Sequence, residues 1–213
     1  MTNILLLGDS IRLFYQDAVR KKLGDNYNVY GPDENCRFAS YALNSLRFYL
    51  SEFPTPDIIH WNIGLWDIAI LYPCDGCFTP IEEYVRYMKL ILRELKKTGA
   101  KIIFATTTPV SDEKAFLEGP FPPRGENSDI IKYNRRILEE FADEDIEIND
   151  LFSLVYFEKE KYLRDDMVHP NEDGVDILSD AVCNKIKSIG YFRNENATQK
   201  SLDISEISEK TIQ

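Results

Sequence analysis

The sequence predicts an α/β fold, in which a parallel sheet is covered by helices on both faces. Short apolar runs, which are typical of buried strands, alternate along the chain with longer segments of helical periodicity. The chain has 213 residues, a length that one α/β domain commonly fills. Its hydrophobic fraction of 44% is sufficient for a substantial core, so we expect most of the chain to fold.

Five strands are expected, each a short apolar run bounded by turn residues or charges. The first is the run Ile4–Leu7, which Gly8 closes. The others are expected at 28–30, closed by Gly31 and Pro32, and at 57–63, 101–106 and 146–148. In a parallel sheet of this kind, ligands bind beyond the carboxyl ends of the strands.

The helices between these strands carry signals at their ends. Thr79-Pro80-Ile81-Glu82 has the form of a capping box with proline at the first helical position, and Gly99 is the matching stop signal. Ser128 is expected to cap a second helix and Asn171 a third. Two earlier helices are expected near residues 11–23 and 39–52.

Charge and hydrophobicity exclude some partners. The net charge of −11 argues against nucleic acid or an anionic membrane surface, because phosphate binding needs basic patches. No apolar stretch approaches the ~20 residues of a membrane span. The apolar run at the N-terminus is too short for a signal peptide, so we expect a cytoplasmic protein. Residues 1–193 are expected to form the domain, followed by a polar tail at 194–213.

Cys74 and Cys77 have the spacing of a redox motif or of half a zinc site. Zinc would need two more ligands, and the chain has only two histidines. A redox pair of the thioredoxin type should open a helix after a strand, whereas this pair lies in a loop that contains proline and glycine. A plain turn with free thiols is therefore favoured, and no metal or cofactor is expected.

The residues best suited to catalysis are Ser10, Asp166 and His169. Ser10 directly follows the first strand, so it is expected at the carboxyl edge of the sheet, where a helix begins. Taken alone, Asp9 or Ser10 reads as a helix cap. Asp166, three residues before His169 in a polar loop, changes that interpretation, because a serine nucleophile needs a base and the base needs a group to orient it.

Gly8-Asp9-Ser10 and the Asp166-x-x-His169 motif together resemble the first and last sequence blocks of the SGNH (GDSL-like) hydrolase family. The segments 127–134 and 148–151 resemble a branch of the same family, and the resemblance spans roughly residues 3–190. It implies a flavodoxin-like, three-layer α/β/α sandwich with a five-stranded parallel sheet. It also implies ester hydrolysis, with Ser10 as nucleophile, His169 as base and Asp166 as its orienting group.

Two family blocks differ from their usual form. Trp66 occupies the place of the asparagine that usually lines the oxyanion hole, and Arg37 holds the place of a glycine that donates its N–H. We expect the amide of Asn62 and the backbone N–H groups of Ser10 and Arg37 to form the hole. The Arg37 side chain either binds an anionic substrate group or pairs with an acidic neighbour, and pairing is favoured. Asp9, Gly64 and Trp66 are expected to contact substrate.

Other candidates have alternative interpretations. His60, in the middle of a strand, reads as a core histidine rather than a catalytic one. Trp61 and Phe121 either line a pocket or pack in the core, and packing is favoured. The loop 119–125 is expected at the active edge, where its length suits a role in specificity.

The function expected from these residues is hydrolysis of a carboxylic ester through an acyl-enzyme, without a cofactor. By analogy with the family alone, the first candidate substrate is a small acyl group on a carbohydrate. The alternatives are a thioesterase or lysophospholipase, and a binding protein whose site has decayed. The intact set of Ser10, Asp166 and His169 argues against decay.

Overall fold

A computed structural model describes residues 1–70, 75–111 and 125–189 of the chain. Its five strands form one parallel sheet in the order β2-β1-β3-β4-β5, as expected for a flavodoxin-like sheet. The strands are β1 (Thr2–Gly8), β2 (Tyr27–Tyr30), β3 (Ile58–Asn62), β4 (Lys101–Ala105) and β5 (Glu147–Asn149). The predicted fold class is confirmed.

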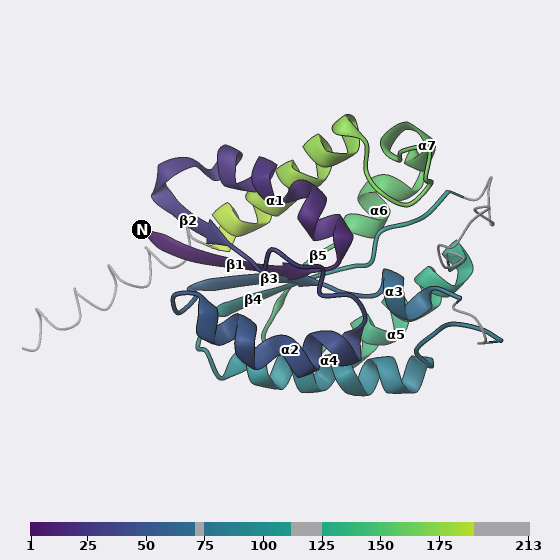
Figure 1. The fold of residues 1–213 in the computed structure, drawn as a ribbon, viewed down its shortest axis with the longest axis horizontal. Helices are drawn as coiled ribbons and strands as arrows, with labels where there is room; N and C mark the ends of the chain where they lie inside the picture. The colour runs from purple at the N-terminus through teal and green to yellow at the C-terminus, as the bar shows by residue number, and fades with distance from the viewer. Residues whose placement is uncertain (71–74, 112–124, 190–213) are drawn as a thin grey trace, which may run out of the picture.

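Helices cover both faces of the sheet (Figure 1). They are α1 (Ser10–Leu23), α2 (Ala39–Glu52), α3 (Leu65–Ile68), α4 (Ile81–Lys96), α5 (Asn127–Glu140), α6 (Leu151–Tyr156), α7 (Lys159–Tyr162) and a last helix at 172–189. A 3₁₀ turn, η1 (Gly24–Asn26), joins α1 to β2. One face carries α1 and the helix 172–189, and the other carries α2, α4 and α5.

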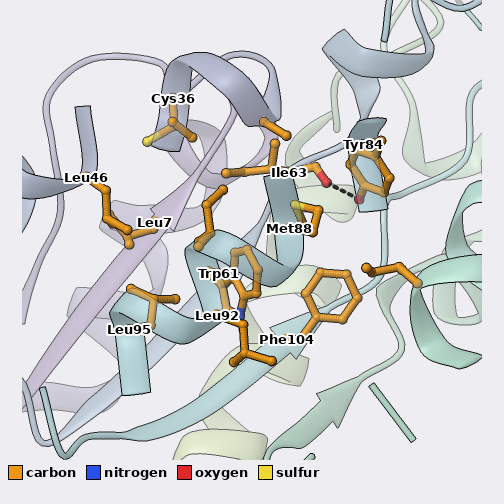
Figure 2. Close-up of a cluster of buried hydrophobic side chains, with 14 of the residues drawn as sticks. Leu7, Cys36, Leu46, Trp61, Ile63, Tyr84, Met88, Leu92, Leu95 and Phe104 are labelled. Atoms are coloured by element: carbon orange, nitrogen blue, oxygen red, sulfur yellow. Dashed lines mark hydrogen bonds between the residues drawn. The ribbon is translucent and has the colours of Figure 1, made fainter. Parts of the chain in front are cut away.

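The core has two halves because successive side chains of a strand point to opposite faces. Leu7, Trp61 and Phe104 pack with α2, α4 and α5 (Figure 2). Ile4, Leu6, Ile58 and Ile103 pack with α1 and the helix 172–189. His60 and Asn62 share the parity of Ile58 on β3, so their side chains face α1.

Two of the predicted helix caps are wrong. The α4 helix begins at Ile81, with Pro80 in the cap position, and the Thr79 hydroxyl bonds Asp67 instead of closing a capping box. The α5 helix begins at Asn127, so Ser128 lies inside it and its hydroxyl bonds the Glu126 carboxylate at 3.3 Å. A buried acceptor in the first case and a helix start two residues earlier than predicted in the second account for the errors.

The remaining end signals are confirmed. Asn171 Oδ1 accepts a hydrogen bond from the Gly174 N–H at 2.9 Å, which makes Asn171 a helix cap. Gly99 has a φ of +74°, a conformation that suits glycine and ends the turn after α4. Among the described residues, no helix combines the length and the apolar character needed to cross a membrane. The expected tail, Cys74 and Phe121 lie outside the described residues.

Candidate active site

Ser10 is the first residue of α1, and Asp9 alone separates it from the end of β1. Asp9, not Ser10, caps this helix, because its carboxylate accepts a hydrogen bond from the Ile11 N–H at 3.0 Å. The serine hydroxyl therefore has other partners. β1 and β3 are neighbours at the point where the strand order reverses, so Ser10 lies where ligands bind in sheets of this kind.

The structure brings Ser10, His169 and Asp166 together, as the sequence predicted. Ser10 Oγ lies 2.8 Å from His169 Nε2, and His169 Nδ1 lies 2.9 Å from Asp166 Oδ2. The imidazole thus contacts a hydroxyl through one nitrogen and a carboxylate through the other. In this arrangement the carboxylate selects the tautomer with hydrogen on Nδ1, which leaves Nε2 as an acceptor for the serine proton.

Asp166 is held by the same loop that carries His169. Its Oδ1 accepts hydrogen bonds from the backbone N–H groups of Val168 at 3.0 Å and His169 at 2.9 Å. Partial burial raises the pKa of Asp166, but these bonds and the imidazole outweigh that effect, and the pKa lies below its ordinary value. The carboxylate consequently stays charged and available to the imidazole over the neutral pH range.

The loop has the geometry of a tight hairpin. Leu163 and Pro170 form an antiparallel bridge, and the Arg164 N–H donates to the His169 carbonyl at 2.8 Å. The Ser111 N–H, after β4, donates to the Met167 carbonyl at 3.0 Å. Because both the ends and the tip of the hairpin are bonded, the positions of Asp166 and His169 are fixed relative to the sheet.

Arg37 has a left-handed backbone conformation, with φ at +53°. Its N–H donates to the side-chain oxygen of Asn35 at 2.7 Å, so the structure does not present it as the free oxyanion donor that the sequence analysis expected. The Asn35 oxygen must move aside before this N–H can serve a substrate. The neighbouring Cys36 N–H bonds the Gly8 carbonyl at 3.1 Å, so the segment does lie beside the turn that carries Ser10.

The Arg37 side chain lies above the ring of Tyr41, with 4.7 Å between its central carbon and the ring centroid. The acidic neighbour, Glu34, accepts hydrogen bonds from the hydroxyls of Tyr41 and Tyr49, both at 2.8 Å. A stack on Tyr41 thus takes the place of the favoured ion pair. Arg37 nevertheless helps to keep the pKa of Glu34 below its ordinary value, after the two tyrosine hydroxyls.

Arg12 is a buried arginine that the sequence analysis did not single out. Its side chain is 0% exposed and donates to the carbonyls of Pro32 at 2.6 Å and Glu34 at 2.7 Å. It also bonds the Gln16 side chain at 2.9 Å. Arg12 therefore ties the loop that carries Arg37 to the helix that begins at Ser10. An arginine on the first turn of a helix gives no sequence signal of burial.

Asn62 ends β3 next to the nucleophile turn, but its side chain is 3% exposed. Its Oδ1 accepts a hydrogen bond from the Tyr15 hydroxyl at 2.9 Å, and its Nδ2 donates to Asp9 Oδ1 at 3.4 Å. Nδ2 carries a second hydrogen, which is the one an oxyanion would use. The role of Asn62 as a donor stays a prediction.

Asp9 and Gly64, which we expected to contact substrate, are buried. Asp9 is 1% exposed, and its carboxylate accepts hydrogen bonds from Ile11, Asn62 and the Leu65 N–H. Gly64 is buried, and a side chain there would collide with Thr107. These residues join loops beneath the surface, and their contact with substrate stays a prediction. Trp66 is half-buried, and its contact with substrate stays a prediction.

Two asparagines of α5 hold the segment that follows β4. Asn134 accepts from the Thr107 N–H and donates to the Thr107 carbonyl, both at 2.9 Å. Asn127 accepts a hydrogen bond from the Val110 N–H at 3.0 Å and donates one to the Val110 carbonyl at 2.6 Å. Each amide thereby satisfies a backbone donor and acceptor at once. These asparagines belong to the segment 127–134 noted in the sequence, and their role is to fix the active edge.

Three of the four cysteines lie in the part of the chain that the structure describes. Cys36, Cys77 and Cys183 are free thiols, and Cys74 lies outside the described residues. Within residues 1–70, 75–111 and 125–189, no cluster of three or more histidine, cysteine or acidic side chains is arranged to hold a metal ion.

Comparisons with known proteins agree with this fold. No family model matches the sequence, and no curated protein matches it. Among solved structures, an acetyl xylan esterase superposes with a TM-score of 0.69 at 18% identity, over 86% of this chain and 99% of that one. The chain has the fold of known esterases.

Two further structures support that statement. A GDSL-like lipase from Bacteroides thetaiotaomicron superposes with a TM-score of 0.68 at 17% identity, over 88% of this chain and 89% of that one. The psychrotrophic esterase EstA from Pseudoalteromonas sp. superposes with a TM-score of 0.67 at 14% identity, over 88% of this chain and 98% of that one. The similarity covers nearly the whole length of each solved chain, so the fold is shared as a unit.

Proposed function

We propose that the protein is a carboxylic ester hydrolase that works through an acyl-enzyme on Ser10. The observation that carries this proposal is the pair of contacts made by His169, at 2.8 Å to Ser10 Oγ and at 2.9 Å to Asp166 Oδ2. Nucleophile, base and orienting group are within hydrogen-bond reach of one another at the carboxyl edge of the sheet. The shared fold with solved esterases supports the same reaction class.

In the proposed reaction, Ser10 Oγ attacks the acyl carbon while His169 Nε2 takes the hydroxyl proton. The ester carbonyl becomes a tetrahedral oxyanion, stabilised by the Ser10 N–H and the free Nδ2 hydrogen of Asn62. The Arg37 N–H joins them when the Asn35 side chain moves away. His169 then protonates the leaving alcohol. Water, deprotonated by His169, attacks the acyl-enzyme and releases the acid.

For the substrate, we propose a small acyl group, of which an acetyl group on a carbohydrate is the first candidate. Two of the solved structures with this fold are described as an acetyl xylan esterase and an acetyl esterase. We also propose a cytoplasmic location, which the free thiols of Cys36, Cys77 and Cys183 suit, because disulfides are rare in reducing compartments.

The test is to treat the pure protein with a fluorophosphonate probe and to map the labelled residue by mass spectrometry. Labelling at Ser10, lost in Ser10→Ala and after heat denaturation, supports an active serine hydrolase. An unlabelled protein would identify a decayed binding protein. Turnover of acetyl esters and acetylated xylan above that of octanoyl esters, lysophospholipids and acyl thioesters supports the substrate class, and the reverse order overturns it.

A further inference from the structure

A row of buried polar side chains crosses the sheet directly behind the nucleophile turn. Tyr15 and His60 are 0% exposed, Asn62 is 3% and Asn149 is 7%. They come from α1, β3 and β5, and the row ends at Asp9, beside Ser10. Polar groups are costly to bury unless each finds a partner, so the hydrogen bonds among them determine how each one is oriented.

The contacts join neighbouring members of this row. Asn149 Nδ2 lies 3.1 Å from His60 Nε2, and His60 Nδ1 lies 3.4 Å from the Tyr15 hydroxyl. That hydroxyl lies 2.9 Å from Asn62 Oδ1, and Asn62 Nδ2 lies 3.4 Å from Asp9 Oδ1. Four contacts thus connect the end of β5 to the residue before the nucleophile.

Elementary hydrogen-bond chemistry gives these contacts one direction. Burial raises the pKa of Asp9 to about 6, so above that pH its ionised carboxylate only accepts, and it selects the Asn62 orientation with Nδ2 toward it and Oδ1 toward Tyr15. A tyrosine hydroxyl has a single hydrogen, and the amide oxygen takes it. The hydroxyl oxygen must therefore accept from His60 Nδ1–H. The neutral ring then has a bare Nε2, which accepts from Asn149.

We propose that His60, Tyr15 and Asn149 are positioning residues that lock the amide of Asn62 for oxyanion binding. This inference rests on the proposed function. Because Tyr15 holds the amide oxygen and Asp9 holds one Nδ2 hydrogen, the amide plane is fixed before the reaction begins. A donor that is oriented in advance stabilises developing charge without reorganisation.

Two features of the site suit this role. Burial lowers the pKa of His60 to about 3, so the ring stays neutral throughout the physiological range. Gly8 lets the elements approach, since a Cβ there would lie 2.7 Å from Asn62 Oδ1 and 2.7 Å from the Arg12 Cβ. No side chain at position 8 separates the nucleophile turn from Asn62.

The hydrogen-bond chain is tested by NMR of the ¹⁵N-labelled imidazoles, which is independent of activity. The protein has only two histidines, so His60 and His169 are separated by one assignment variant. We expect His60 as the Nδ1–H tautomer at pH 7 to 8, where Asp9 is ionised, and a redistribution toward Nε2–H in Tyr15→Phe. An Nε2–H tautomer in the wild-type protein overturns the chain, because Tyr15 would then have no donor on its His60 side.

The positioning role is tested by kinetics on Tyr15→Phe. We expect kcat to fall about tenfold, with KM little changed, because the ground-state substrate does not depend on the Asn62 amide. The matched control is Tyr133→Phe, which removes a buried hydroxyl that donates to the Thr79 carbonyl on the other face. Tyr133→Phe should lower the melting temperature about as much as Tyr15→Phe does, and it should leave kcat unchanged.

A double-mutant cycle separates action through Asn62 from general destabilisation. In an Asn62→Ala background, Tyr15→Phe should cost no further kcat, because the amide it orients is absent. If the two substitutions lower kcat additively, the inference is overturned. Failure of the fluorophosphonate to label wild-type Ser10 counts against the proposed function, and with it against any positioning role. The His60 tautomer then still decides whether the hydrogen-bond chain exists.

Discussion

The ring of Phe14 lies stacked on the imidazole of His169, with 4.9 Å between centroids and 24° between planes. Arg164 lies over the ring of Phe14, 5.3 Å from its centroid. The imidazole therefore has an aromatic neighbour on its face in addition to its two in-plane hydrogen bonds. Phe14 lies on the first turns of the helix that begins with Ser10, so one helix supplies both the proposed nucleophile and a surface against which the proposed base packs.

This stack predicts that Phe14→Ala lowers kcat about tenfold, because the imidazole gains freedom to leave the line between Ser10 and Asp166. KM should change less than kcat. Steady-state hydrolysis of p-nitrophenyl acetate measures both. Phe48→Ala is the control, since Phe48 is 69% exposed on α2. Equal kinetics for the wild-type protein and Phe14→Ala would show that the two hydrogen bonds alone hold the ring.

Ser10→Ala should fold normally and lose on the order of 10⁴-fold in ester hydrolysis, because the three residues act as a unit. Circular dichroism checks the fold, and turnover of p-nitrophenyl acetate checks the loss. Treatment of the wild-type protein with EDTA should leave its turnover unchanged. Near-wild-type activity in a clean Ser10→Ala preparation would identify a different nucleophile.

Asn62→Ala should lower kcat by roughly 10²- to 10³-fold with little change in KM, the usual cost of one oxyanion donor. Trp66→Phe, which removes the indole N–H but keeps most of the bulk, should cost much less. The comparison uses the same ester and the same assay for both variants. If Trp66→Phe is the more damaged of the two, the indole and not the amide is the donor.

Arg37→Gly should be more stable than Arg37→Ala by about 1 kcal/mol. Both variants lose the guanidinium, but only glycine adopts the φ of +53° without strain, and this gain exceeds the extra entropy of glycine in the unfolded chain. Urea unfolding of the two variants measures the difference. Equal stability would mean that the Asn35 oxygen, bonded to the N–H of residue 37, already offsets the strain.

Asp67 predicts a pH dependence of stability. Burial raises its pKa from 3.8 to about 7, so the folded state holds a proton that the unfolded state has lost. Its contribution to the free energy of unfolding is full below about pH 4 and falls as pH rises through 7. Asp67→Asn should remove this slope. His60, whose pKa is lowered to about 3, acts in the opposite direction below pH 6.5.

The measurement is therefore a comparison of thermal unfolding for wild-type and Asp67→Asn protein between pH 5 and 8. The melting temperature of the wild-type protein, relative to the variant, should decrease as pH rises. Parallel curves would show that Asp67 is ionised in the folded state at pH 5. The hydrogen bonds of Asp67 to the Ala39 N–H, at 3.1 and 3.0 Å, would then compensate for its burial.

The sheet and the three proposed catalytic residues were within reach of sequence reasoning for a physical reason. The sequence shows where strands and helices begin and end and in which order they follow one another. That order places residue 10 and the loop before the last helix at one edge of the sheet. Ser10 and His169 meet there even though the chain between them was only coarsely predicted. The one-dimensional pattern was sufficient because topology, not side-chain detail, brings them together.

The polar interior behind the site was not within reach. Arg12 bonds the carbonyls of Pro32 and Glu34, which come within its reach only when the loop after β2 folds back over α1. Tyr15 finds Asn62 only because β3 lies against that helix. The burial of Asp9 was missed for the same reason, since Asn62 and Leu65, which donate to its carboxylate, lie more than 50 residues away along the chain. A single sequence contains no record of such contacts.

The separation of Ser10 and His169 by 159 positions has a consequence for synthesis of the chain. The ribosome makes the nucleophile among the first residues and its base among the last of the described domain. Under the proposed mechanism, a nascent or truncated chain thus holds a serine without a general base, and we expect it to hydrolyse no esters. Under that mechanism we expect turnover to begin only when the helix 172–189 has docked, so enzyme activity in a translation reaction would report completed folding in real time.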